Sequence, residues 1–137
     1  MASWIADVEA KLHTLVKYKG EKAFKTDYPN IYYTTDNMAS TETHYPTVYM
    51  KFLPNGESGR DLEGNRINAY LCGIQLEVTV SKEQGQTVAK KVMWQAIETL
   101  QSKGFEVFNT PEDISTSADN RRYVARVRRN IGFNDYI

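Results

Sequence analysis

Five arginines lie close together near the end of this 137-residue chain, and their side chains are the ones best suited to strong polar contacts. No acidic residue lies among them. They are Arg121, Arg122, Arg126, Arg128 and Arg129. Arginine binds carboxylates and phosphates through paired hydrogen bonds, and it is enriched at protein interfaces. The cluster therefore predicts a subunit interface or internal ion pairs, with a solvated face or a phosphate-binding strip for nucleic acid as the alternatives.

Two polar segments that contain acidic residues offer partners for these arginines. One spans residues 57–63, within the segment 54–66 that is long for a connection between strands, and the other spans residues 112–119, within the segment 109–120. Their composition, like that of residues 36–44, is compatible with ordering only on assembly. We expect an acidic segment to meet the arginines within one copy or between two copies of the chain. The candidate subunit-interface residues are Glu57, Arg60, Asp61, Glu63, Arg122, Arg126 and Arg128.

Residues that could perform catalysis or hold a metal are few. The two histidines, His13 and His44, do not have a metal-ligand spacing with the single cysteine, Cys72. His13 falls on an exposed-looking position of a helix, and Cys72 falls on the apolar face of a strand, where a buried thiol is usual. Serine-hydrolase, phosphate-loop and zinc-protease motifs are absent from the sequence. We therefore predict a protein that is not an enzyme, with no catalytic residues, no cofactor and no metal.

The overall composition is that of an ordinary globular domain. The chain has a mass of 15.7 kDa, a net charge of zero, 41% hydrophobic and 25% charged residues, and we expect one domain over residues 1–137. A neutral chain argues against DNA binding as the main function. No apolar run approaches the roughly 18 residues of a membrane span. Acidic residues near the N-terminus do not fit a signal peptide, so we expect a cytoplasmic setting.

Hydrophobic periodicity predicts the elements that carry these residues. Apolar residues at helical spacing predict a first helix that ends at Gly20, and a second that follows a capping box, Ser81 to Gln84, and ends at Lys103-Gly104. Alternating or β-branched segments predict strands at 31–35, 45–53, 70–80, 105–108 and 121–131. This order predicts an α+β fold: an antiparallel or mixed β-sheet with two main helices packed on one face and a long projecting hairpin.

Local sequence motifs add to this order of elements. A strand opens with Tyr45 to Tyr49 (YPTVY), and a segment with glycine and acidic residues follows. Residues 75–80 (QLEVTV) then run straight into a helix, and residues 123–127 (YVARV) belong to the closing strand. In this order and at about this length, nearly the whole chain resembles the tail terminator (tail completion) proteins of long-tailed bacteriophages.

The resemblance implies a structural function in a virion. Members of that family form a ring, typically a hexamer, on the head-proximal end of the tail tube, where it stops tube polymerisation and provides the head-joining surface. The implied partners are other copies of the chain, the tail tube protein and head–tail connector proteins, with no membrane contact. The implied location is the virion tail, after assembly in the host cytoplasm. DNA passes through such a ring without sequence-specific binding, so the arginines are not expected to line the channel.

Two alternatives to a tail terminator remain open. The chain could be another head–tail connector, a head-closure protein or a minor tail subunit, all of which work through broad contacts between proteins. It could also be a nucleic-acid-binding module that uses Arg122, Arg126 and Arg128 of the closing strand. No aromatic residue alternates with these arginines on their own face of the strand, which argues against the second alternative.

Overall fold

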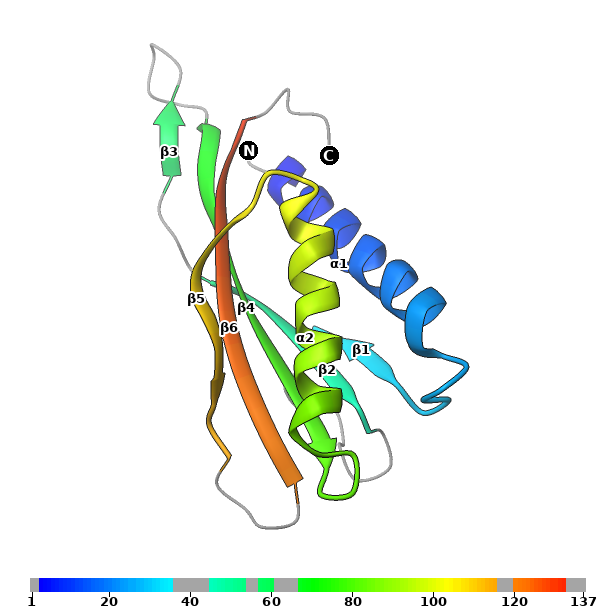
Figure 1. Ribbon diagram of the computed structural model, residues 1–137. Helices are drawn as coiled ribbons and strands as arrows, with labels where there is room; N and C mark the ends of the chain where they lie inside the picture. Colours follow the sequence, from blue (N-terminus) through cyan, green and yellow to red (C-terminus); the bar gives the residue numbers. More distant parts are fainter. Residues whose placement is uncertain (1–2, 36–44, 54–56, 61–66, 116–119, 133–137) are drawn as a thin grey trace.

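The computed structural model describes residues 3–35, 45–53, 57–60, 67–115 and 120–132, in which a helix precedes each of two runs of strands (Figure 1). Within these ranges there are two helices and six strands. Their order along the chain is α1 (Ser3–Phe24), β1 (Tyr32–Thr34), β2 (Thr47–Leu53), β3 (Glu57–Arg60), β4 (Ile67–Ser81), α2 (Gly85–Gln101), β5 (Glu106–Asp113) and β6 (Asn120–Gly132).

The strands form one mixed sheet in the order β1-β2-β4-β6-β5, with β3 added beside β4. The β1–β2 pair is parallel, and the other pairs are antiparallel. Figure 1 shows α2 running alongside the long strands β4 and β6, while α1 lies beside α2. The predicted α+β fold with a mixed sheet and two helices is therefore confirmed.

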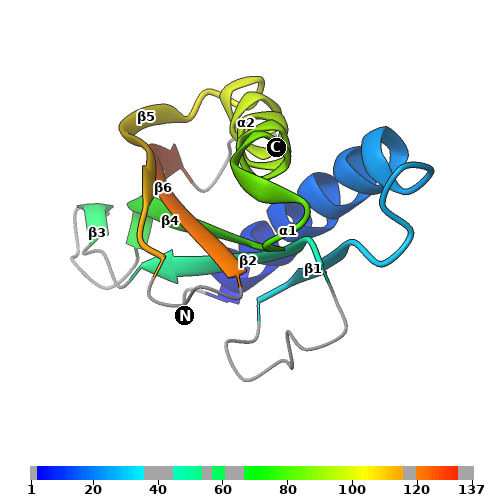
Figure 2. The ribbon, with the colours of Figure 1, turned by 60° about the horizontal axis from the view of Figure 1, so that its bottom comes forward.

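The core lies between the two helices and one face of the sheet. Every second residue of β4 from Cys72 to Val80 is at most 2% exposed, because successive strand side chains point to opposite faces. The apolar stripe predicted for α1 supplies Leu12 and Val16, and α2 adds Ile97, all fully buried in the same cluster. The opposite sheet face is therefore left without a covering layer among the described helices (Figure 2).

The predicted capping box is present before α2. The Ser81 backbone N–H donates to Gln84 Oε1 at 3.2 Å, and the Gln84 backbone N–H donates to Ser81 Oγ at 3.3 Å. This reciprocal pair closes the turn that leads from β4 into α2, but it does not cap the helix itself: the N-cap residue of α2 is Gln84, which makes no side-chain capping hydrogen bond, and Gly85 at the first helical position has a φ of +75°. Gln84 Nε2 also donates to the Tyr45 carbonyl at 3.3 Å, which ties the turn to the segment before β2.

The prediction that the first helix ends at Gly20 is wrong, because α1 continues to Phe24. Gly20 is a packing position instead: a Cβ atom built there would lie 1.7 Å from the hydroxyl oxygen of Tyr33. Tyr33 is 3% exposed and belongs to the core between α1 and β1. Glycine is therefore needed at this position for the close approach of a tyrosine ring.

Helix α2 ends at Gln101, two residues before the predicted Lys103-Gly104. Gly104 has a φ of +88°, in the left-handed region that glycine adopts most easily. Arg129, one of the clustered arginines, donates from Nη1 to the Lys103 carbonyl at 2.8 Å. A cation at the carbonyl end of a helix is favourable, so this arginine acts within its own chain.

Two segments predicted as loops contain strands. Residues 57–60 form β3, which pairs with β4, and β5 continues past Phe108 to Asp113. In both cases pairing with a long neighbouring strand outweighs weak local strand propensity. Pro111 is tolerated in β5 because it lies on an edge strand, where the register shifts between Asn109 and Glu112. The predicted hairpin tip at 61–66 lies outside the described residues, so its projection stays a prediction.

Candidate functional site

The uncovered face of the sheet carries the predicted arginines Arg122, Arg126 and Arg128. Residues at alternate positions of each strand point to this face, and the register between strands brings them into rows. We use the name open face for a set of residues on this side of β2, β4, β5 and β6. They are Tyr49, Lys51, Gln75, Glu77, Thr79, Glu106, Phe108, Arg122, Val124, Arg126 and Arg128.

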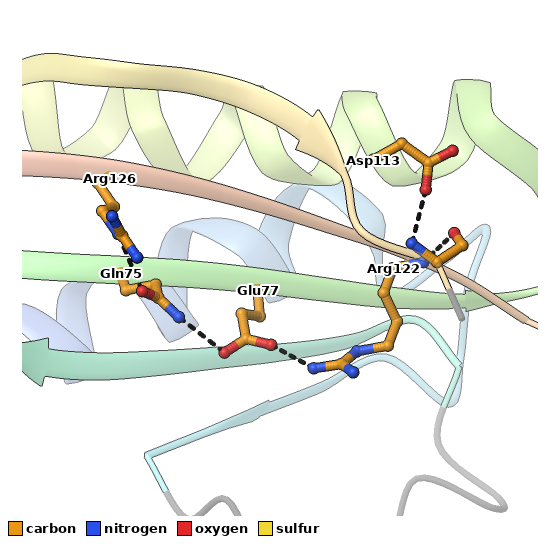
Figure 3. Close-up of polar contacts among 6 residues, drawn as sticks. Gln75, Glu77, Asp113, Arg122 and Arg126 are labelled. Carbon is orange, nitrogen blue, oxygen red and sulfur yellow. Dashed lines mark hydrogen bonds and ion pairs between the residues drawn. The ribbon is translucent and has the colours of Figure 1, made fainter. Parts of the chain in front are cut away.

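Four polar side chains of the open face form a continuous chain across β4 and β6 (Figure 3). Arg122 Nη2 lies 2.5 Å from Glu77 Oε1, and Gln75 Nε2 donates to Glu77 Oε2 at 3.0 Å. Gln75 Oε1 in turn accepts a hydrogen bond from Arg126 Nε at 2.9 Å. The antiparallel register explains this arrangement, because it places Gln75 directly opposite Arg126.

The two arginines at the ends of this row of hydrogen-bonded side chains differ in how far their charge is neutralised. Arg122 pairs with the carboxylate of Glu77, whose side chain is only 13% exposed, so this arginine is neutralised within the molecule. Arg126 is exposed and bonds to the neutral amide of Gln75. No carboxylate in the described part of the chain forms an ion pair with Arg126. The positive charge of Arg126 is therefore free to attract a partner molecule.

Arg128 stacks on an aromatic ring of the edge strand β5. Its Cζ atom lies 4.9 Å from the ring centroid of Phe108, which is 40% exposed. The contact holds the guanidinium over an apolar surface through a cation–π interaction, and it leaves donor groups available to a partner. Phe108 was not among the predicted site residues. Phe105 is buried, so alternation along the strand places Phe108 on the open face together with Glu106. An aromatic residue at an exposed strand position is the sequence signal that could have identified it.

The predicted acidic partners are not tested by the geometry. Glu57 and Arg60 lie in β3, where their backbones pair with Tyr70 and Ile67, but their side chains are outside the described part of the structure. Asp61 and Glu63 are also outside it. The structure therefore brings Arg122, Arg126 and Arg128 together on one face and leaves the contribution of the acidic segment as a prediction.

Apart from Glu77 of β4, described acidic residues near the arginines lie along β5. Glu106 is the register partner of Arg128, and Glu112 and Asp113 are exposed farther along the strand. Asp113 accepts a hydrogen bond from the Ser115 backbone N–H at 2.8 Å, and hydrogen bonds from Ser115 hold the pKa of this carboxyl below its usual range. This edge of the sheet is thus negatively charged beside a positively charged face.

His13 and Cys72 do not join the open face. Cys72 is buried with a free thiol, as predicted. The prediction of an exposed His13 is wrong, because the ring is half-buried between α1 and β1, where it bonds to the Tyr33 backbone. Burial, with a smaller effect of Lys17, lowers the pKa of His13. Helical spacing alone missed this contact because the partner strand is far along the chain.

No group of three or more His, Cys, Asp or Glu side chains among the described residues is arranged to hold a metal ion. Neither described helix is long and apolar enough to cross a membrane.

No family model matches the chain, and no curated protein matches it. The interpretation of the open face therefore depends on its geometry alone: the exposed guanidinium groups of Arg126 and Arg128 are able to bind carboxylates or phosphates.

Proposed function

We propose that the protein is a tail terminator of a long-tailed bacteriophage, which forms a ring on the head-proximal end of the tail tube. The resemblance in the order of its elements supports this proposal. The contacts of the open face support it as well, because they suit an interface between proteins. A single copy of this chain would be one segment of the ring, and the open face would contact the next copy.

The observation that carries the proposal is the exposure of Arg126 and Arg128 on a sheet face that neither described helix covers, where neither arginine forms an ion pair with a described carboxylate. A closed ring needs two different surfaces of one subunit that fit together. The open face supplies a positive surface with an exposed aromatic ring, a composition typical of interfaces. The acidic side of β5, with Glu112 and Asp113, or the segment 57–63 of the next copy would supply the negative surface.

This arrangement also agrees with the passage of DNA through a ring. Arginines that contact the next subunit are removed from the channel, so they do not bind the phosphate backbone during passage. The same contacts are stronger at low ionic strength, because exposed charges are screened over about 8 Å at physiological salt. Ring formation is therefore expected to weaken as salt concentration rises.

A test of the proposal adds the protein to the cognate tail tube protein while tubes polymerise. We expect short tubes with one capped end in electron micrographs, and a mean length that falls as the amount of added protein rises. A matched reaction receives the variant with Arg126→Glu and Arg128→Glu, which should leave tube length unchanged. Tubes of equal length with and without the wild-type protein would contradict the proposal.

A second candidate function is nucleic-acid binding, which is favoured by the position of Phe108 beside Arg128. An aromatic ring next to a guanidinium group is a common surface for an unpaired base. Fluorescence titration with single-stranded and duplex DNA separates this function from the first. Binding that persists at about 0.15 M salt and weakens with a slope of several phosphate contacts would favour it. Absence of binding at that salt concentration would exclude it.

A further inference from the structure

A groove runs between α1 and α2, on the side of the molecule away from the open face. Two adjoining hollows of about 480 and 640 Å³ share Leu15 of α1 and Lys103, which follows α2. Along α1 the lining extends from Ala10 to Lys19, about 14 Å given the rise per residue of a helix. This elongated shape suits a short segment of another polypeptide better than a compact small molecule.

The α1 side of the groove presents apolar surface. Leu15 is half-buried, and Ala10 lies beside it in the lining. The ring of Tyr18 borders the same hollow and is 59% exposed, the highest value for a large hydrophobic side chain in the described part of the chain. Apolar side chains of a partner would remove Leu15 and Tyr18 from water, which favours binding.

The rim of the groove is positively charged. Its ionisable residues are three lysines and one acidic residue: Lys11, Lys19, Lys103 and Glu98. None of the four forms an ion pair with another described residue. Unpaired lysines on both sides of an apolar floor are complementary to a segment that carries carboxylates on both sides of an apolar stripe.

The α2 side of the groove contains a polar atom without a partner. Gln95 Nε2 donates to Thr99 Oγ1 at 3.2 Å, and Thr99 Oγ1 donates to the Gln95 carbonyl at 3.0 Å. These bonds leave Gln95 Oε1 buried with no hydrogen bond among the described residues. A buried acceptor without a partner is unfavourable, so this side of the groove would gain from any rearrangement on binding that brought a donor to Gln95 Oε1.

We propose that the groove between α1 and α2 docks an acidic amphipathic segment of a partner protein. The apolar side of that segment covers Leu15 and Tyr18, and its carboxylates meet Lys11, Lys19 and Lys103. This inference does not depend on ring formation, because the groove and the open face lie on opposite sides of the sheet. Its test is therefore independent of the tube-capping test.

An NMR titration with two synthetic peptides tests the proposal. The probe is a helical peptide of about three turns, with leucines on one face and glutamates on both flanks. The control peptide has lysine in place of each glutamate. We expect the acidic peptide to shift the amide signals of Leu15, Thr99 and Ser102, with weaker binding at higher salt. The control peptide should leave these signals in place.

Charge variants locate the binding energy in the groove. The double variant Lys19→Glu and Lys103→Glu should weaken binding of the acidic peptide by about tenfold or more, because two attractions become repulsions. Lys17→Glu is the matched control, since Lys17 is an exposed lysine of α1 outside the groove lining. This control should bind the acidic peptide as the wild type does. Circular dichroism checks that all variants remain folded.

Several results of this experiment would overturn the proposal. Shifts confined to open-face residues such as Thr79 and Arg126 would place the peptide on the other side of the sheet. Equal binding of the two peptides would remove the role of charge. The same groove shifts with free glutamate would indicate a site for small anions. Groove shifts that depend on protein concentration without peptide would make a second copy of the chain the occupant.

Discussion

Gly20 occupies a helix interior, where alanine is ordinarily more favourable by about 1 kcal/mol. The structure reverses this preference, because a methyl group at Gly20 would overlap the buried ring of Tyr33. We predict that Gly20→Ala lowers the free energy of unfolding by about 1–3 kcal/mol, the usual cost of overpacking a core. Urea unfolding measures the change.

Tyr33→Phe is the matched control for this glycine. The Tyr33 hydroxyl is buried without a hydrogen bond among the described residues, so its removal should change stability far less than Gly20→Ala does. Stability of Gly20→Ala equal to or above that of the wild type would show that the ring and the helix do not pack as described.

His13 links stability to pH at the same α1–β1 contact. Burial lowers its pKa below the usual 6.5, so the unfolded chain takes up a proton at a higher pH than the folded chain does. The contribution of the neutral His13 ring to the free energy of unfolding is therefore fully present above about pH 6.5, and it is lost as the pH falls below that value. We predict that His13→Gln reduces the loss of stability as the pH falls from about 7 to about 5. NMR titration of the ring protons should give a pKa below 6.5; a higher value contradicts the assignment.

At the scale of elements, the turn between β4 and α2 is closed by one reciprocal pair of hydrogen bonds. Ser81→Ala removes the acceptor for the Gln84 backbone N–H, and we predict a loss of about 1 kcal/mol in the free energy of unfolding. Ser102→Ala, just after the same helix, is the control, because its hydroxyl donates only to the Thr99 carbonyl in the described part of the chain. Equal losses for the two variants would contradict a special role for the capping box.

Elements with strong internal periodicity were predictable from the sequence. The alternation around Leu76 and the helical spacing of Leu12 and Val16 reflect burial on one face, which a single segment reveals by itself. The strands β3 and the end of β5 were missed, because both depend on pairing with a long neighbour rather than on local propensity.

The open face was only partly predictable. Alternation placed Arg122, Arg126 and Arg128 on one side of a strand, but it could not show that Arg122 is neutralised by Glu77, some 45 residues away. The contact of Arg128 with Phe108 depends likewise on the register between β5 and β6. Partners that come from other strands are set by the sheet topology, which the local pattern does not contain.

For the whole molecule, the difference between Arg122 and the other two arginines predicts different outcomes of charge reversal. Arg126→Glu with Arg128→Glu changes exposed side chains without a described carboxylate partner, so the variant should stay folded and lose the ability to assemble. Sedimentation and urea unfolding measure these two properties separately.

Arg122→Glu is the comparison variant. It sets a second carboxylate beside Glu77, and we predict a loss of about 1–2 kcal/mol in stability, a modest value because Arg122 is 39% exposed and solvent screens the repulsion. If the Arg126 and Arg128 reversals unfold the protein instead, these arginines act within the chain and the interface account is wrong.

The central claim is that this chain works by docking to other copies of itself through charge-matched surfaces. The most direct test is the native mass of the purified protein, measured alone and after incubation with tail tube protein. We predict a species of several chains of 15.7 kDa each, six in a ring of the usual size, in solution or on the tube ends. A mass of one chain under both conditions, with no protein bound to tubes, would contradict the account.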